Sequence, residues 1–320
     1  MRRVYCHLGA LVLGSSFLVI GTSACTARDC DSVKEVEHEE GEPARENEEG
    51  ACVELVQTKR WWGEPQENTG AYESGKNVVV ANGNGEINVT VTSGTDINVV
   101  FEPFVTNAYD TCNDQPDTGN GRCTEIDDNL SKQELIFEDT DGNYLIQAQR
   151  NGGRASLGAN ITVELPSSFD GRLTVDQNNG STDVALSGEL AALILQSNNG
   201  PCDINTGSAR EIDIRCENGS TDVVIGGIPA GDELRQIYKD DGDLGDLTVA
   251  FPSTDVAFSV SAQSVESDVI LSPADVSSVG CEKLGDDPRS ITVACNGGTQ
   301  DDPVYHLTNG ESLNDLTVTF

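Results

Sequence analysis

The sequence predicts an all-β fold, a β-solenoid of stacked short strands with about 20 residues in each coil. Three observations predict it. From residue 77 onward, β-branched apolar residues alternate with polar ones in short runs, which is typical of half-buried strands. Nine Asn-Gly dipeptides supply the positive φ angles that tight turns require. One turn, with the same flanking pattern, occurs three times at a nearly fixed interval.

The three copies surround Gly180, Gly200 and Gly219, which are 20 and 19 residues apart. Apolar residues stand seven and five positions before each glycine and four after it. The columns are Leu173, Leu193 and Ile212; Val175, Leu195 and Ile214; and Val184, Ile204 and Val223. Each copy also has Asn just before the glycine. Because two strands of about six residues cannot bury their apolar face alone, the copies are expected to stack, with an Asn ladder at one corner.

A fourth copy, Phe258–Leu271, aligns without a gap over Leu173–Leu186 and has Val265 in place of the turn glycine. Residues 229–247, "PAGDELRQIYKDDGDLGDL", separate it from the third copy. Their many acidic residues predict a side loop or an irregular strand outside the repeat.

The composition divides the chain into five parts. Within residues 26–75, the stretch "KEVEHEEGEPARENEEG" holds many acids and almost no apolar side chains, so it cannot bury enough surface to offset the entropy of ordering. The predicted parts are a signal peptide (1–24), an acidic disordered tether (25–75), N-terminal strands with a Cys112/Cys123 loop (76–134), the β-strand repeat (135–280) and C-terminal capping strands (281–320).

The first 25 residues predict export. Two arginines precede the mostly apolar stretch Leu8–Ile20, and small residues lead to Cys25. The sequence Thr22-Ser-Ala-Cys25 resembles a bacterial lipobox, although Thr22 replaces the usual Leu, so we expect lipidation of Cys25. The alternative is ordinary signal-peptide cleavage, with Cys25 paired or free. Thr26 stands where an inner-membrane retention signal has Asp, which favours the outer membrane or cell surface; a domain facing the periplasm is a further alternative.

Eight cysteines remain after Cys6 and Cys25, and an even number in an exported chain indicates disulfides. We expect sequential pairing into four short loops, although spacing alone does not fix the connectivity. A Cys202–Cys216 bridge would join two adjacent coils. A zinc site would need CxxC-type spacing, which the sequence lacks. The candidates are Cys30, Cys52, Cys112, Cys123, Cys202, Cys216, Cys281 and Cys295.

Several motifs together resemble the bacterial putative-adhesin family of β-strand-repeat proteins, which are typically exported or tethered to a membrane. They are "VVVANGNGEINV", "INVVF", "LIFEDTDGNYLIQA", "ITVELP" and the serial "NNG" turns, spread over residues 77–271. The resemblance implies the stacked-strand fold more than a particular role. The cysteines, the loop "NAYDTCNDQPDTGNGRCTE" and the tail after Gly280 depart from the family pattern.

Two groups of acidic residues are candidate calcium ligands, because hard oxygen ligands in a stacked row resemble a chelating site. The first is a column with Asp268 as its counterpart in the fourth copy, and the second is an acidic loop. For the column we favour a local role, in which each carboxylate accepts hydrogen bonds from its own turn. The candidates are Asp183, Asp203 and Asp222 in the column, and Asp240, Asp241, Asp243 and Asp246 in the loop.

The sequence contains little that indicates an enzyme. The stretch "GAYESGK", Gly70–Lys76, has phosphate-loop spacing, but Asn77 replaces the Ser or Thr, and the preceding strand and following helix are missing. There is no Gly-x-Ser-x-Gly and no His-Glu-x-x-His. A net charge of −35 argues against nucleic-acid partners, since phosphates would be repelled.

These observations predict a non-catalytic, lipid-anchored envelope protein without a cofactor. Its partners would be an envelope or extracellular glycan or protein, and the membrane through the lipid anchor. Two alternatives stay open: an enzyme that acts on polysaccharide with carboxylates on one face, and a purely structural envelope or surface-layer component.

Overall fold

A computed structural model describes residues 59–107, 128–140, 142–152, 157–231, 233–239, 245–299, 302–310 and 315–320. These residues form twenty strands, β1–β20, in one hydrogen-bonded sheet, together with a 3-10 helix, η1 (Val276–Val279). The chain is thus predominantly β, as predicted. Two contact units exist, Met1–Trp61 with Val105–Asp127 and Trp62–Phe104 with Asp128–Phe320. Nearly all described residues belong to the second unit, which is described below.

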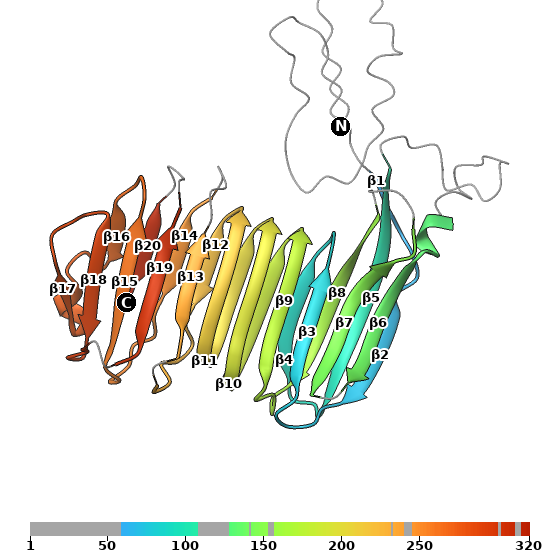
Figure 1. Ribbon diagram of the computed structural model, residues 1–320, viewed down its shortest axis with the longest axis horizontal. Helices are drawn as coiled ribbons and strands as arrows, with labels where there is room; N and C mark the ends of the chain where they lie inside the picture. Colours follow the sequence, from blue (N-terminus) through green and yellow to red (C-terminus); the bar gives the residue numbers. More distant parts are fainter. Residues whose placement is uncertain are drawn as a thin grey trace, which may run out of the picture. The chain divides into compact units, whose positions relative to one another are not determined.

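The strands of this unit pair side by side in two rows (Figure 1). Row A runs, in spatial order, through β6 (Gln133–Thr140), β7 (Asn143–Arg150), β3 (Asn77–Asn82), β9 (Arg172–Asn179), the second halves of β10 (Thr182–Asn199) and β11 (Cys202–Asn218), β13 (Arg235–Lys239), β19 (Val304–Asn309), β15 (Phe258–Ser264), β18 (Ser290–Cys295) and β17 (Cys281–Leu284).

Row B runs through β2 (Gln66–Ala71), β5 (Asp96–Asn107), β8 (Leu157–Pro166), β4 (Ile87–Thr92), the first halves of β10 and β11, β12 (Thr221–Val224), β14 (Leu247–Ala250), β20 (Leu316–Thr319) and β16 (Val269–Ser272). The inner pairs of both rows are parallel, and antiparallel pairs lie toward the ends. We call a row-A strand and the row-B strand that follows it in the chain a layer.

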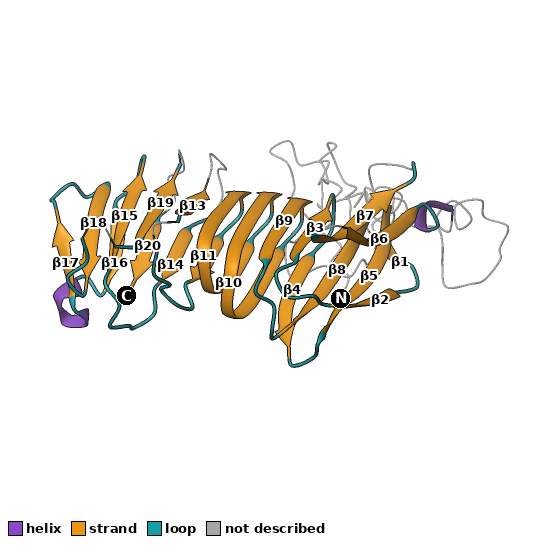
Figure 2. Ribbon diagram, turned by 60° about the horizontal axis from the view of Figure 1, so that its bottom comes forward, coloured by secondary structure: helices purple, strands orange, loops and turns teal. Residues whose placement is uncertain are grey.

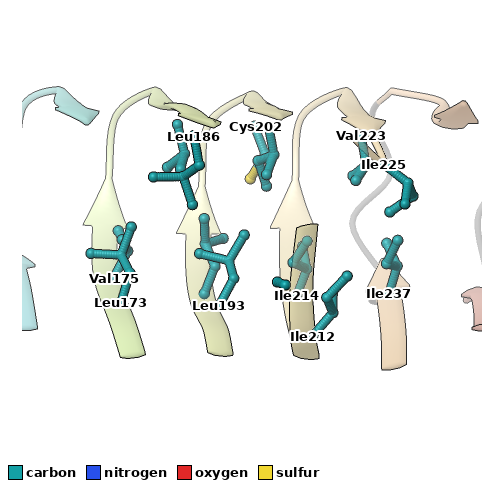
Figure 3. Packing of buried hydrophobic residues seen from close by; sticks show 14 of the residues in the cluster. Leu173, Val175, Leu186, Leu193, Cys202, Ile212, Ile214, Val223, Ile225 and Ile237 are labelled. Atoms are coloured by element: carbon teal, nitrogen blue, oxygen red, sulfur yellow. The ribbon is translucent and has the colours of Figure 1, made fainter. Parts of the chain in front are cut away.

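The three sequence copies lie in register on neighbouring layers. Leu193 pairs with Leu173 on one side and with Ile212 on the other, and Ile204 lies between Val184 and Val223. These side chains point inward and are at most 1% exposed. The columns therefore form a continuous core between the two rows, as Figure 3 shows for the middle layers.

The corner between the rows requires glycine and is lined by asparagine. Gly200 has φ +130°, and a Cβ there would lie 2.2 Å from the carbonyl oxygen of Gly180 in the adjacent layer. Only a residue without a Cβ allows this backbone approach. Outside the turn, Asn199 Nδ2 donates to Asn179 Oδ1 at 3.2 Å, and Asn218 Nδ2 donates to Asn199 Oδ1 at 3.0 Å. The predicted Asn ladder is present.

The expectation of a side loop or an irregular strand over residues 229–247 was wrong for the residues that the structure describes. These include β13 and the start of β14, which complete a regular layer: Ile237 lies beside Ile214, and Val249 beside Val223. Residues 232 and 240–244 lie outside the described residues. The sequence hides this layer because Arg235 and Lys239 occupy inward positions at which the other copies have uncharged residues.

Backbone carbonyls hold these two buried cations. The Arg235 guanidinium, fully buried, donates to the carbonyls of Pro229, Gly231 and Glu233 at 3.1–3.3 Å. Its centre lies 5.7 Å from the Tyr305 ring centroid in the next layer. Lys239 Nζ donates to the carbonyls of Glu217 and Gly219, at 3.2 and 2.8 Å, and burial lowers its pKa. Hydrogen bonds to the turns therefore replace apolar packing at these positions.

The fourth copy forms a layer, β15 and β16, but its register is displaced by two residues from the sequence alignment. Val260, not Phe258, stands in the column of Leu173, and Ile270, not Asp268, ends the column of Asp183. Because the side-chain period of a strand is two, such a displacement keeps every side chain on the same face, so the apolar pattern does not reveal it.

The spatial order of the layers departs from chain order at two places (Figure 2). The layer of β19 and β20 lies between β13/β14 and β15/β16, parallel to both. We call it the inserted layer. Only β17 and β18 follow β15 in row A, so residues 281–320 do not all cap the stack as expected. Likewise, β3 and β4 lie between β7/β8 and β9/β10.

Ordered strands begin inside the predicted tether, residues 25–75. β1 (Lys59–Trp62) and β2 both precede residue 76. β2 is polar and almost entirely exposed, but each of its residues pairs antiparallel with β5. β2 is therefore ordered because its backbone pairs with an apolar neighbouring strand. The amino-acid composition of residues 25–75 does not indicate this pairing. The rest of the predicted tether and the signal peptide, residues 1–58, lie outside the described residues.

Two disulfides join cysteines 14 residues apart, Cys202–Cys216 and Cys281–Cys295. The first links the layer of Gly200 to the layer of Gly219 in the core, as expected for a bridge between adjacent copies. The second links β17 to β18. The cysteines that lie outside the described residues are Cys6, Cys25, Cys30, Cys52, Cys112 and Cys123.

No helix within the described ranges has the length and apolar character needed to cross a membrane.

Candidate binding surface

The outward face of row B bears charge of one sign. None of its strands, from β2 to β16, contains Lys or Arg in the row-B portion. At its centre, Asp183 pairs in register with Asp203, and Asp203 with Asp222. In-register strands lie about 4.8 Å apart, so three carboxylates follow one another at that interval. Asn88 continues this column on one side and Thr248 on the other.

These three carboxylates, which we call the Asp row, have no neutralising partner. None of them forms a hydrogen bond or an ion pair with any residue that the structure describes. The expected local bonds to turn amides are absent from the described structure, because those amides bond the next layer: Gly200 N donates to Asn218 O at 2.8 Å and Cys202 N to Ser220 O at 2.9 Å. Partial burial and, secondly, the charge of Asp203 raise the pKa of Asp183.

The structure tests the two calcium candidates only in part. Across the described ranges, no group of three or more His, Cys, Asp or Glu side chains is arranged to hold a metal ion. In the acidic loop, Asp246 Oδ1 accepts a hydrogen bond from Asp315 N at 3.2 Å. Asp240, Asp241 and Asp243 lie outside the described residues, so calcium binding by that loop stays a prediction.

The outward face of row A differs, because some of its carboxylates are paired with arginines. Arg172 Nη2 lies 2.9 Å from Glu211 Oε2, and Arg215 Nε lies 3.1 Å from Asp213 Oδ1. Gln236 Nε2 also donates to Asp213 Oδ1 at 2.9 Å. Exposed pairs of this kind contribute little stability, but the arginines offset part of the negative charge of row A, whereas the row-B portions of the strands contain no basic residue.

The stretch that resembles a phosphate loop binds an anion, but the anion is the chain's own Asp170. Asp170 Oδ1 accepts from the Tyr72 hydroxyl at 2.7 Å and from Gly75 N at 2.8 Å, and Oδ2 accepts from the Ser74 hydroxyl at 2.6 Å. These donors lower the pKa of Asp170 to about 2, and burial followed by the bond to Asp170 raises that of Tyr72 to about 12. The turn between β2 and β3 is thereby fixed to the start of β9. Two of these three donors, the Tyr72 and Ser74 hydroxyls, stand at unspecified positions of the Gly-x-x-x-x-Gly-Lys spacing, so the spacing itself did not predict the contact.

No protein-family model matches the chain, and no curated protein matches it. The chain is similar to several solved structures, including the following three. A putative cell adhesion protein from Clostridium sporogenes is 12% identical, with 80% of this chain and 99% of that chain covered and a TM-score of 0.44. A putative adhesin from Bacteroides fragilis is 11% identical, with 80% and 97% covered and a TM-score of 0.26. A putative adhesin from Parabacteroides merdae is 10% identical, with 59% and 90% covered and a TM-score of 0.24.

Substituting the middle residue of the Asp row should stabilise the protein. D203N removes repulsion from both neighbours, and like charges on adjacent strands cost roughly 0.2–1 kcal/mol. We expect the low end of this range in salt, because these side chains are exposed. Urea unfolding at pH 7 measures the change. D176N, an exposed carboxylate in row A beside Ala81 and Gln196, is the matched control and should change little.

A destabilised D203N variant, or a calcium-dependent rise in stability that D203N abolishes, would instead show that the Asp row holds a cation. The pH dependence gives a second check. Because the pKa of Asp183 is raised in the folded state, the stability linked to this group is present at low pH and is lost as pH rises through that pKa.

The Asp170 contact should be visible in acid titration. The pKa of Asp170 is lowered to about 2, so its stabilising contribution is present above the unfolded value near 3.9 and is lost as pH falls toward 2. The amide chemical shift of Gly75, which donates to this carboxylate, should titrate with the same midpoint. In S74A, which removes the donor of the shortest hydrogen bond to Asp170, the midpoint should move up toward 4. A Gly75 midpoint near 4 in the unsubstituted protein would contradict the contact.

Proposed function

We propose that the chain is a non-catalytic binding module, anchored to the cell envelope by a lipid on Cys25 and carried on the acidic segment that follows. The observation that carries the proposal is the row-B face, where the row-B portions of the strands lack basic residues and the central column holds three unpaired carboxylates. A row of like charges without neutralising partners costs stability, and a binding partner that supplies hydrogen-bond donors or positive charge would remove this cost.

We further propose that the described strands form a β-solenoid. Support comes from the parallel, in-register pairing of successive layers and from glycines at the same corner of each copy. In this arrangement each outward column is a straight series of side chains at about 4.8 Å intervals. Such a surface suits a partner that is itself extended or repetitive.

The negative charge of the row-B face limits the classes of partner that can bind to it. Anionic polymers, including nucleic acids, would be repelled by a surface without Lys or Arg in the row-B portions of its strands. We therefore propose a neutral glycan or a protein with a basic surface, at the outer membrane or outside the cell. Row A, where arginines pair with some of the carboxylates, contributes less to this selectivity.

Surface proteolysis of intact host cells, with mass spectrometry of the Cys25 peptide, tests the anchoring. We expect the strands to be shed while an acylated Cys25 peptide stays with the membrane. An unmodified Cys25 peptide, or a freely soluble mature protein, would contradict the lipid anchor. Protection of the domain until the outer membrane is broken would place it in the periplasm and remove a role in contact with other cells.

Binding of the full mature chain to glycan and protein arrays tests the proposed surface. The variant D183N/D203N/D222N neutralises the Asp row, and D176N/E211Q/D213N changes the net charge equally on row A. We expect the first variant to lose binding and the second to keep it. Equal loss in both would indicate non-specific charge effects, and hydrolysis of a bound glycan would contradict the non-catalytic assignment.

A further inference from the structure

The inserted layer occupies a slot whose walls belong to an earlier part of the chain. β19 pairs with β13 on one side and β15 on the other, and β20 pairs with β14 and β16. Both walls lie within residues 235–272, which precede residue 304 in the sequence. Without β19 and β20, the slot would present two rows of backbone donors and acceptors on each wall.

The contacts that fill the slot are extensive. Four apolar side chains of the inserted layer are at most 1% exposed: Tyr305, Leu307, Leu316 and Val318. Backbone bonds reach both walls: Gly310 N donates to Lys239 O at 2.8 Å, and Ser259 N donates to Pro303 O at 2.9 Å. The segment thus binds the slot through its own strands and core side chains.

The covalent link that brings the segment to its slot is short and passes around a strand. β15 lies between β18 and β19, so the chain must cross β15 between Cys295 and Val304. This crossing includes the turn at Asn296 and Gly297, with φ of 54° and 77°. The link determines which copy supplies the segment, whereas the slot contacts themselves do not depend on it.

We propose that the inserted layer is exchangeable, so that β19 and β20 of one copy fill the slot of a second copy and join the two. An exchanged dimer keeps every slot contact and changes only the connection between β18 and β19, which is the general condition for strand exchange at low cost. Exchange occurs while chains fold, because a folded copy must break backbone bonds on both sides of β19 and β20 to release them. This inference does not depend on what the row-B face binds.

Cysteine cross-linking in cells tests the exchange on the full chain. Tyr238 in β13 and Thr308 in β19 pair in register on the outward face of row A. Two differently tagged chains, Y238C and T308C, are co-expressed and treated with a short, membrane-permeable bismaleimide. We expect a cross-linked heterodimer that carries both tags, and a tenfold rise in expression should raise its ratio to monomer about tenfold by mass action. The matched control pair is D176C with Q196C, which pair in the same outward column between consecutive layers and should give no heterodimer.

The double variant Y238C/T308C separates the possible outcomes. Cross-linking within one chain shows that β19 lies beside β13 in the folded protein. If the double variant cross-links within one chain but the mixed single variants give no heterodimer at any expression level, the exchange is refuted. Heterodimer in the control pair at the same level as in the test pair would also refute it, since aggregation would then be the cause.

Discussion

Alanine in place of Gly200 is expected to remove more than about 3 kcal/mol from the free energy of unfolding. The φ of +130° costs an L-residue about 1–3 kcal/mol. The added Cβ would also lie 2.2 Å from the carbonyl oxygen of Gly180, so the layers must separate. Separation of these two layers weakens the bond from Gly180 N to Asn199 O and the contacts of the Asn ladder. Urea unfolding followed by circular dichroism measures the loss.

Gly188→Ala is the matched control, because Gly188 also has a positive φ, +84°, but a Cβ there meets nothing within 4 Å. Only the conformational cost remains, about 1–2 kcal/mol. The difference in free energy of unfolding between the two variants measures the cost of the clash between the added Cβ and the adjacent layer. If both variants lost the same stability, the close approach of the turns would not be what demands glycine at this corner.

Removal of the Cys202–Cys216 disulfide is expected to cost about 3 kcal/mol, the loop-entropy value for a ring of about 15 residues. Both sulfurs lie in the core and join two layers, so their loss should also lower the cooperativity of unfolding across those layers. The variant C202A/C216A avoids placing new hydroxyls in this buried site. Urea unfolding under oxidising conditions, with both the midpoint and the m-value recorded, measures the effect.

The disulfide Cys281–Cys295 provides a control with the same spacing of 14 residues. It joins β17 to β18, where β17 is the last strand of row A, so C281A/C295A should loosen this strand and leave the middle layers intact. Hydrogen exchange resolves the two effects. Equal loss of protection in β10 and β11 for both variants would contradict a local role for the second bridge.

Local periodicity predicted the middle of the molecule. The columns through Leu193 and Ile204, the glycine corner and the Asn ladder follow from a fixed interval and a side-chain period of two, both of which the sequence shows directly. The same period concealed the displacement of Val260 by two residues. Arg235 and Lys239 concealed a whole layer, because carbonyl partners from the turns replaced the apolar signal there.

The arrangement of the layers and the charge of the row-B face were not predictable in this way. The pairing of Leu307 with Ile237 joins residues far apart in the chain, and no local pattern encodes it. The Asp row was visible as a column, but its lack of partners depends on which strands share its face. The partner of the "GAYESGK" turn, Asp170, is likewise distant in sequence. The sequence therefore predicted the local arrangement of strands and turns, whereas contacts between residues far apart in the chain became known only from the structure.

The displaced position of β3 and β4 has a consequence for the order of folding. Val78 of β3 pairs with Leu173, 95 residues later, whereas Leu173 pairs with Leu193 only 20 residues away. Loop-closure entropy grows with separation, and chains with distant contacts fold more slowly. The middle layers, β9 to β12, should therefore form the folding nucleus. β3 and β4 are synthesised before β9 and would pair only after β9 and β10 have formed. The stack would then grow from its centre toward both ends.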